Sequence, residues 1–157
     1  MKSPLMTFLS MLNKGIVNGR VQPQVPKTFG LAHRKKADEI NVNSFQITDE
    51  YIDPLARAFE LSVNLRKLDL RRCNLSVVNC GKIIQHLPEY LEILNMSHNF
   101  EFGPTNAKLI CEEVLNDPRF ILDSVILEEC NIGDEGIEHF GTLLSNKNAS
   151  LIHLDVS

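Results

Sequence analysis

The chain has 157 residues, of which 43% are hydrophobic and 23% are charged, so it is long enough to fold around one sizeable core. It contains no apolar run long enough to cross a membrane as a helix. Its four cysteines form neither a CxxC pair nor a zinc-ligand spacing, which favours buried, reduced thiols over a disulfide framework or a zinc site. Reduced thiols are typical of the cytoplasm, where we expect the protein to reside.

Positive charge is concentrated at the beginning of the chain. Residues 1–36 hold seven Lys or Arg and no acid, whereas the rest of the chain holds nine basic and twenty acidic residues. Glycines and prolines between residues 15 and 30 break any regular element there. We therefore expect a basic extended arm over residues 1–36 that docks on an acidic surface such as tubulin, actin or anionic lipid. Its expected contact residues are Lys27, Arg34, Lys35 and Lys36.

Three other interpretations of this arm stay open. They are a mobile tail without a partner, an organelle-targeting peptide, and a secretion signal built on "LMTFLSML". Threonine and serine interrupt that apolar stretch, and no small-residue cleavage site follows it cleanly. Nucleic acid is not expected as a partner, because seven dispersed charges do not form a groove-reading motif.

After residue 36, one pattern of apolar residues recurs along the chain. Its copies begin at residues 37, 65, 91, 122 and 151. Each full copy carries apolar residues at its first, fourth and sixth positions, and "LRKLDLRRCNL" (65–75) and "LDSVILEECNI" (122–132) match best. The ninth position is Cys or Asn, except in the first copy, which has Phe45. In the third copy we expect Phe100 or Phe102 to replace the aliphatic residue of the eleventh position.

The two halves of each copy predict two different elements. Apolar residues at the fourth and sixth positions predict a short strand with one buried face, and therefore that Leu68 and Val125 are buried. The second halves have helical spacing, with starts expected near Pro54, Thr105 and Asp134. The expected apolar stripes are Leu55, Ala56 and Phe59; Ile83, Ile84 and Leu87; Leu109, Ile110 and Val114; and Ile137, Phe140 and Leu144.

The pattern L-x-x-L-x-L-x-x-[C/N]-x-L resembles the leucine-rich repeat family, and the repeat length of about 28 residues resembles its ribonuclease-inhibitor type. The resemblance implies an α/β fold over residues 37–157. It is a curved solenoid with parallel strands on the concave face and helices on the convex face. The fifth copy stops at its seventh position, so we expect a fragment of a longer solenoid. A truncated chain, or another chain that covers this end, is the alternative.

The second, third, fifth, seventh and eighth positions of each copy are expected to be exposed on the concave face. They are basic in the second copy and acidic in the fourth. We interpret Arg71 and Arg72 as candidate anchors for a protein partner and Ile126 as an apolar contact, with a merely solvated face as the alternative. The full candidate set is Arg66, Lys67, Asp69, Arg71, Arg72, His98, Ile126, Glu128 and Glu129.

Nothing in the pattern points to catalysis, a metal or a cofactor. A nucleophilic Cys73 would need exposure and a nearby base, and its equivalence to Cys130 and Asn99 predicts a structural role instead. The five histidines show no metal-ligand spacing, and "GDEG" (133–136) is typical of a turn and a helix start.

These observations predict a non-enzymatic scaffold for protein–protein interaction, which the charge pattern associates with a cytoskeletal or axonemal assembly in the cytoplasm or cilium. The alternative is a regulator of a small GTPase that resembles the leucine-rich Ran GTPase-activating proteins. The sequence contains no stretch that matches the catalytic arginine loop of that family.

Overall fold

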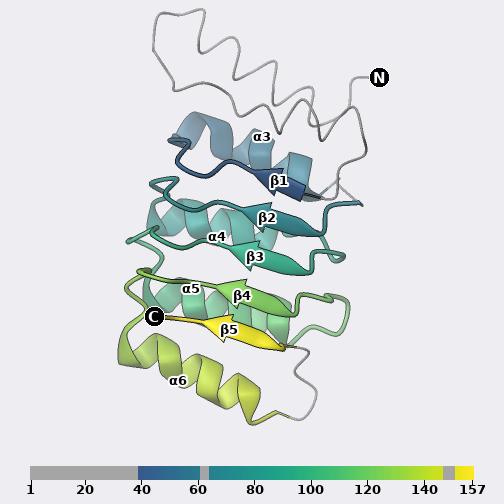
Figure 1. Ribbon diagram of the computed structural model, residues 1–157, viewed down its shortest axis with the longest axis vertical. Helices are drawn as coiled ribbons and strands as arrows, with labels where there is room; N and C mark the ends of the chain where they lie inside the picture. Colours follow the sequence, from purple (N-terminus) through teal and green to yellow (C-terminus); the bar gives the residue numbers. More distant parts are fainter. Residues whose placement is uncertain (1–38, 61–63, 147–150) are drawn as a thin grey trace, which may run out of the picture.

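The computed structural model describes residues 39–60, 64–146 and 151–157, in which short strands alternate with helices (Figure 1). The expected basic arm, with Lys27, Arg34, Lys35 and Lys36, lies outside the described residues. The strands are β1 (Glu39–Asn41), β2 (Lys67–Asp69), β3 (Ile93–Asn95), β4 (Ser124–Ile126) and β5 (His153–Asp155). The helices are α3 (Asp49–Glu60), α4 (Val77–Gln85), α5 (Gly103–Ile110), which continues into the π-helical turn η1 (Cys111–Leu115), and α6 (Gly133–Leu144).

The strands form one parallel sheet in chain order, from β1 to β5. Successive strands pair at offsets of 28, 26, 31 and 29 residues, the same intervals that separate the sequence copies. The fourth-position residues Leu68, Leu94 and Val125 stand in one row across β2, β3 and β4. The predicted register and the α/β class with parallel strands are therefore confirmed.

The helices cover one side of this sheet. Figure 1 shows α4 and α5 behind the strands and α6 below β5. Each helix connects one strand to the next and contacts the next helix along the stack. On β2, Leu68 is buried toward this side, whereas Lys67 is exposed and Asp69 is half-buried. No helix or strand of the described residues covers the other side of the sheet.

The core is built from the inward positions of the repeated pattern. In the second copy these positions are all buried, and Val125 is buried at the corresponding position of the fourth copy, as predicted. Phe102, which is fully buried and lies one residue after the eleventh position, replaces the missing aliphatic residue of the third copy, whereas Phe100 is 58% exposed. The buried residues of the second copy are Leu65, Leu68, Leu70, Cys73 and Leu75.

The predicted helix start is wrong for α3, whereas α5 and α6 begin within two residues of the expected positions. Helix α3 begins at Asp49, so Pro54 is its sixth residue. Buried Tyr51 and Ile52 extend its apolar stripe toward that start. Thr105 and Asp134 lie inside α5 and α6 rather than before them. Both helices begin at a glycine with positive φ, a conformation that glycine adopts without a steric penalty. The two residues are Gly103, with φ of +64°, and Gly133, with φ of +63°.

The apolar stripe expected on α6 is only partly buried. Phe140 is buried as predicted, but Ile137 and Leu144 are 44% and 53% exposed. Helix α6 contacts α5 and η1 on one side, and no element of the described residues lies on its other side (Figure 1). The burial predicted for these two side chains is therefore absent.

Replacing Leu68 by alanine should lower the free energy of unfolding by about 2–5 kcal/mol, because the lost side chain leaves a cavity in the core. Urea denaturation followed by circular dichroism measures this loss. Lys67→Ala, at the exposed neighbouring position, is the control and should change the free energy by less than about 0.5 kcal/mol. A loss below about 1 kcal/mol for Leu68→Ala would contradict the register.

Candidate functional site

The uncovered side of the sheet, together with the turns that follow the strands, is here called the strand face. Lys67, Arg72, Glu128 and Glu129 are exposed on it, whereas the other candidate residues are half-buried. Strand β3 separates β2 from β4, so the strands that carry the basic and the acidic residues lie about two strand spacings, or about 10 Å, apart. The half-buried candidates are Arg66, Asp69, Arg71, His98 and Ile126.

A turn closed by a side-chain acceptor follows most of the strands, and it was not among the features predicted from the sequence. The Asn or Asp at the fifth position of a copy accepts a hydrogen bond from the backbone N–H two residues later, which replaces a backbone turn. The recurrence of Asn or Asp at this position was the available signal. The four bonds are Asn43 N–H to Asn41 Oδ1 (3.0 Å), Arg71 N–H to Asp69 Oδ1 (3.1 Å), Ser97 N–H to Asn95 Oδ1 (3.0 Å) and Ser157 N–H to Asp155 Oδ1 (3.1 Å).

Ile126 is the exception at this fifth position, because its side chain cannot accept a hydrogen bond. The corresponding backbone N–H of Glu128 instead donates to Oγ of the buried Ser97 at 3.2 Å. The neighbouring copy thus satisfies the turn, and Ile126 presents an apolar side chain among polar ones on the strand face.

The two candidate anchor arginines differ in what holds them. Arg71 donates to the carboxylate of Asp69 from its Nε, which lies 3.0 Å from Oδ1 and 3.1 Å from Oδ2, and from its Nη2, which lies 2.6 Å from Oδ2. These hydrogen bonds raise the pKa of Arg71, and the Asp69 side chain is only 14% exposed. Arg71 is therefore already paired with an acid.

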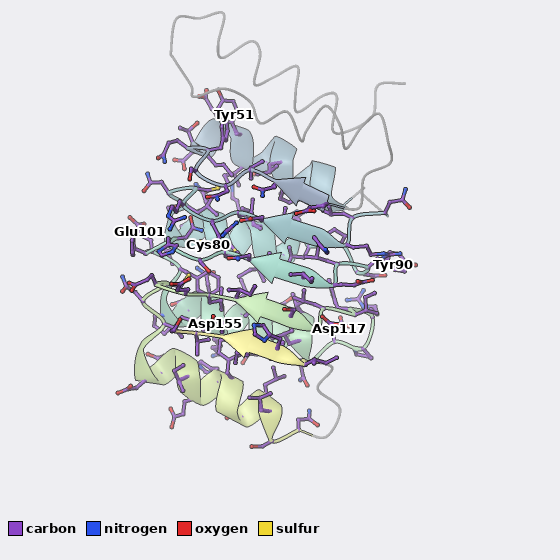
Figure 2. All side chains as sticks on the ribbon, in the orientation of Figure 1. Tyr51, Cys80, Tyr90, Glu101, Asp117 and Asp155 are labelled. Carbon is purple, nitrogen blue, oxygen red and sulfur yellow. The ribbon has the colours of Figure 1, made fainter. Side chains whose placement is uncertain are left out.

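Arg66 is also engaged within the fold. Its Nη1 donates to the carbonyl oxygen of Tyr90 at 2.9 Å, and its guanidinium carbon lies 5.3 Å from the centre of the Tyr90 ring. Its Nε lies 3.7 Å from Oε1 of Glu92. These contacts place Arg66 at the loop between α4 and β3, toward the edge where the strands begin (Figure 2).

Arg72 has no carboxylate partner among the described residues. Its Nη2 lies 3.3 Å from Nε2 of His98, and that nitrogen lies 3.9 Å from Oε2 of Glu128. A guanidinium can only donate, so His98 accepts in this arrangement. Arg72 and His98 both occupy the eighth position and have positive φ, as do Ser44 and Glu129. The fold therefore brings Arg72, His98 and Glu128 together, as the sequence analysis did not foresee.

The cysteines are buried, as the sequence predicts for reduced thiols. All four are buried and free. Burial raises the pKa of the Cys73, Cys80 and Cys111 thiols to about 12 and that of Cys130 to about 11, so the reactive thiolate is suppressed. Cys73 donates weakly to the carbonyl oxygen of Val42 in the neighbouring copy.

Asn99, at the equivalent ninth position, ties two neighbouring copies together. Its Nδ2 donates to the carbonyl oxygens of Leu70 at 2.9 Å and Met96 at 2.7 Å, and its Oδ1 accepts from the backbone N–H of Leu75 at 3.2 Å. Asn99 thus bonds backbone groups both of its own copy and of the neighbouring copy.

Two absences hold for the part of the chain that the structure describes. In residues 39–60, 64–146 and 151–157, no three His, Cys, Asp or Glu side chains are grouped so as to hold a metal ion. Within the same ranges, no helix has the length and apolar character needed to cross a membrane.

Known proteins resemble this chain in sequence and in fold. A family model described as Leucine Rich repeat matches residues 122–141. NACHT, LRR and PYD domains-containing protein 14 of Homo sapiens is 31% identical over 128 residues, which are 79% of this chain and 11% of that protein. The chain thus spans about a tenth of that relative. Leiomodin-1 Actin-Binding Site 2 (ABS2) has a similar fold, with a TM-score of 0.63 at 18% identity over 75% of this chain and 69% of that one.

Replacing Asp69 by alanine should lower the free energy of unfolding by about 1 kcal/mol, because the turn after β2 loses its side-chain acceptor. Asp69→Asn should retain most of that stability, since asparagine makes the same turn after β1 and β3. Urea denaturation of both variants checks this prediction. If the asparagine variant lost as much stability as the alanine variant, the ion pair with Arg71 rather than the turn would be the main role of Asp69.

Proposed function

We propose, from the premise that this chain belongs to the leucine-rich repeat family, that it is a non-enzymatic scaffold that binds a protein partner through its strand face. The observation that carries this proposal is a sheet that, within the described residues, is covered by helices on one side and carries charged side chains on the other. A large open surface of this kind suits a macromolecular partner.

The charges of the strand face define what a partner needs. Lys67 and Arg72 lie in and after β2, and Glu128 and Glu129 follow β4. Half-buried Ile126 lies on the acidic side of this arrangement. A matching partner carries an acidic group that faces β2 and a basic group that faces β4, with apolar surface beside the basic group.

The curvature of the solenoid and the ribonuclease-inhibitor type of its repeats belong to the same proposal. Helices side by side need about 10 Å, whereas paired strands need only about 4.8 Å. Successive helices contact one another here, as do successive strands. This difference in width supports a stack that bends with its strand face inward, which would make that face concave. Strand offsets of 26 to 31 residues support the repeat type.

A cytoskeletal or axonemal placement in the cytoplasm or cilium is a further part of the proposal. Its supports are the seven basic residues of positions 1–36, for which filaments of tubulin or actin offer acidic surfaces, and the fold shared with a site whose name states actin binding. The basic arm would tether the scaffold while the strand face binds a second protein.

Charge and polarity changes on the strand face should abolish partner binding without unfolding the protein. The variant Lys67→Glu, Ile126→Asp places aspartate where β2 and β5 already have it, so the turn after β4 gains an internal acceptor. Partners captured by the wild-type chain in quantitative affinity purification should fall at least about tenfold with this variant.

Lys108→Glu, on the opposite side in α5, is the control and should retain the same partners. Circular dichroism should match for all three proteins. Equal capture by the strand-face variant and the wild type would overturn the proposed binding face.

The full chain should sediment with microtubules or actin filaments at low salt, and sedimentation should weaken as salt rises because screening shortens the reach of the charges. Replacing Lys27, Arg34, Lys35 and Lys36 by alanine should remove most of this binding. Sedimentation with neither filament, or no difference between variant and wild type, would overturn the cytoskeletal placement.

A further inference from the structure

A pocket of about 520 Å³ opens at the edge of the sheet where the strands end. It lies among the turns of the first three copies, with residues from each contributing to its lining. Glu101 stands on its rim, and Figure 2 shows this residue at the opposite edge of the sheet from Tyr90 and Asp117. The pocket is therefore separate from the loops in which the strands begin.

One wall of the pocket is a guanidinium that has no ion pair with an acid among the described residues. Arg71 is bound by Asp69, and Arg66 by Tyr90 and Glu92, but Arg72 meets only His98 in the described residues. His98 accepts from the guanidinium and so holds it at the pocket. A carboxylate is the group that a positioned, unpaired guanidinium binds best.

A second wall is apolar. Phe100 is 58% exposed and stands edge-on to His98, with ring centres 6.4 Å apart. It occupies the tenth position of its copy, where the other full copies have Gln46, Asn74 and Asn131. Leu75 also lines the pocket. An apolar side chain seated against Phe100 would bury the exposed ring.

Two amides complete the pocket. Gln46 and Asn74 are exposed tenth-position residues of adjacent copies, and both line it. By contrast, the corresponding amide of Asn131 donates to the carbonyl oxygen of Phe100 at 2.9 Å. A side-chain amide can donate and accept, which suits the N–H and C=O groups of a peptide backbone.

We propose that this pocket binds an extended peptide segment of the partner protein that carries one acidic side chain close to one apolar side chain. The acid pairs with Arg72, the apolar side chain packs on Phe100, and the amides bond the peptide backbone. The negative charge of Glu101 disfavours a second acid at the rim, so a polyacidic tract is not the ligand. This inference rests on the proposed protein-binding function and specifies its partner.

An array of short synthetic peptides tests the pocket with the full chain. Each peptide places one Asp or Glu beside, or two residues from, one Leu, Ile or Phe in a Gly/Ser background. Companion arrays omit the acid, omit the apolar residue, or replace the acid by Lys. The acid-plus-apolar peptides should bind, and the three companion sets should not. Fluorescence polarisation then gives dissociation constants for the tightest peptide.

Arg72→Gln should weaken that peptide at least about tenfold, because it removes a charge-assisted contact. Arg71→Gln, which removes an arginine already paired with Asp69, is the matched control and should change the affinity less than about twofold. Phe100→Ala should weaken binding about fivefold or more. Glu101→Gln should leave binding equal or tighter, since it removes a repulsive charge.

Binding of Lys-containing peptides, weaker binding on Glu101→Gln, or equal losses for the two arginine variants would overturn the proposal, as would an array without any binder. The array and the partner capture separate the two levels of inference. If no peptide of the array binds but the Lys67→Glu, Ile126→Asp variant loses the partner, the pocket is rejected and the strand face is retained. If the Arg72→Gln variant loses the peptide but the Lys67→Glu, Ile126→Asp variant still captures the partner, the pocket is retained and the strand face is rejected.

Discussion

The whole fold depends on one constraint, which is that a strand of three residues cannot bury its apolar side chain without neighbours on both sides. Leu68 is buried because Leu94 stands beside it in the next strand, and Val125 follows in the same row. The row also sets the spacing of everything on the other side of the sheet. Arg72, His98 and Glu128 come together only because their strands are held in register.

The backbone scaffold could be predicted from the sequence because a strict alternation of apolar residues encodes it. Leu68, Val125 and the ninth-position Asn99 lie where the pattern placed them. The helix starts could not be predicted as well, since glycine backbone conformations rather than an N-cap side chain set two of them, at Gly103 and Gly133. The exposure of Ile137 depends on what stands beyond α6, which periodicity cannot report.

The candidate site was predictable as a surface but not as a set of roles. The repeat register assigned Asp69, Arg71 and Arg72 equally to the exposed face, and side-chain geometry then divided them. Asp69 closes a turn and pairs with Arg71, whereas Arg72 meets a histidine from 26 residues away. The contact between Arg72 and His98 depends on how the copies stack, so no local sequence motif predicts it. The sequence pattern offered Phe100 only as a possible core residue, although its side chain is exposed.

The left-handed backbone at the eighth position has a consequence for how such a protein can change during evolution. Ser44, Arg72, His98 and Glu129 all hold positive φ, and they differ in charge, size and chemistry. Because the bend itself is made by hydrogen bonds from other positions, this position can vary without loss of the fold. The residue types that this position accepts are nevertheless restricted, since β-branched side chains rarely adopt positive φ. Substitutions at this position can therefore change binding specificity without changing the fold, but valine, isoleucine and threonine are disfavoured there and proline is excluded.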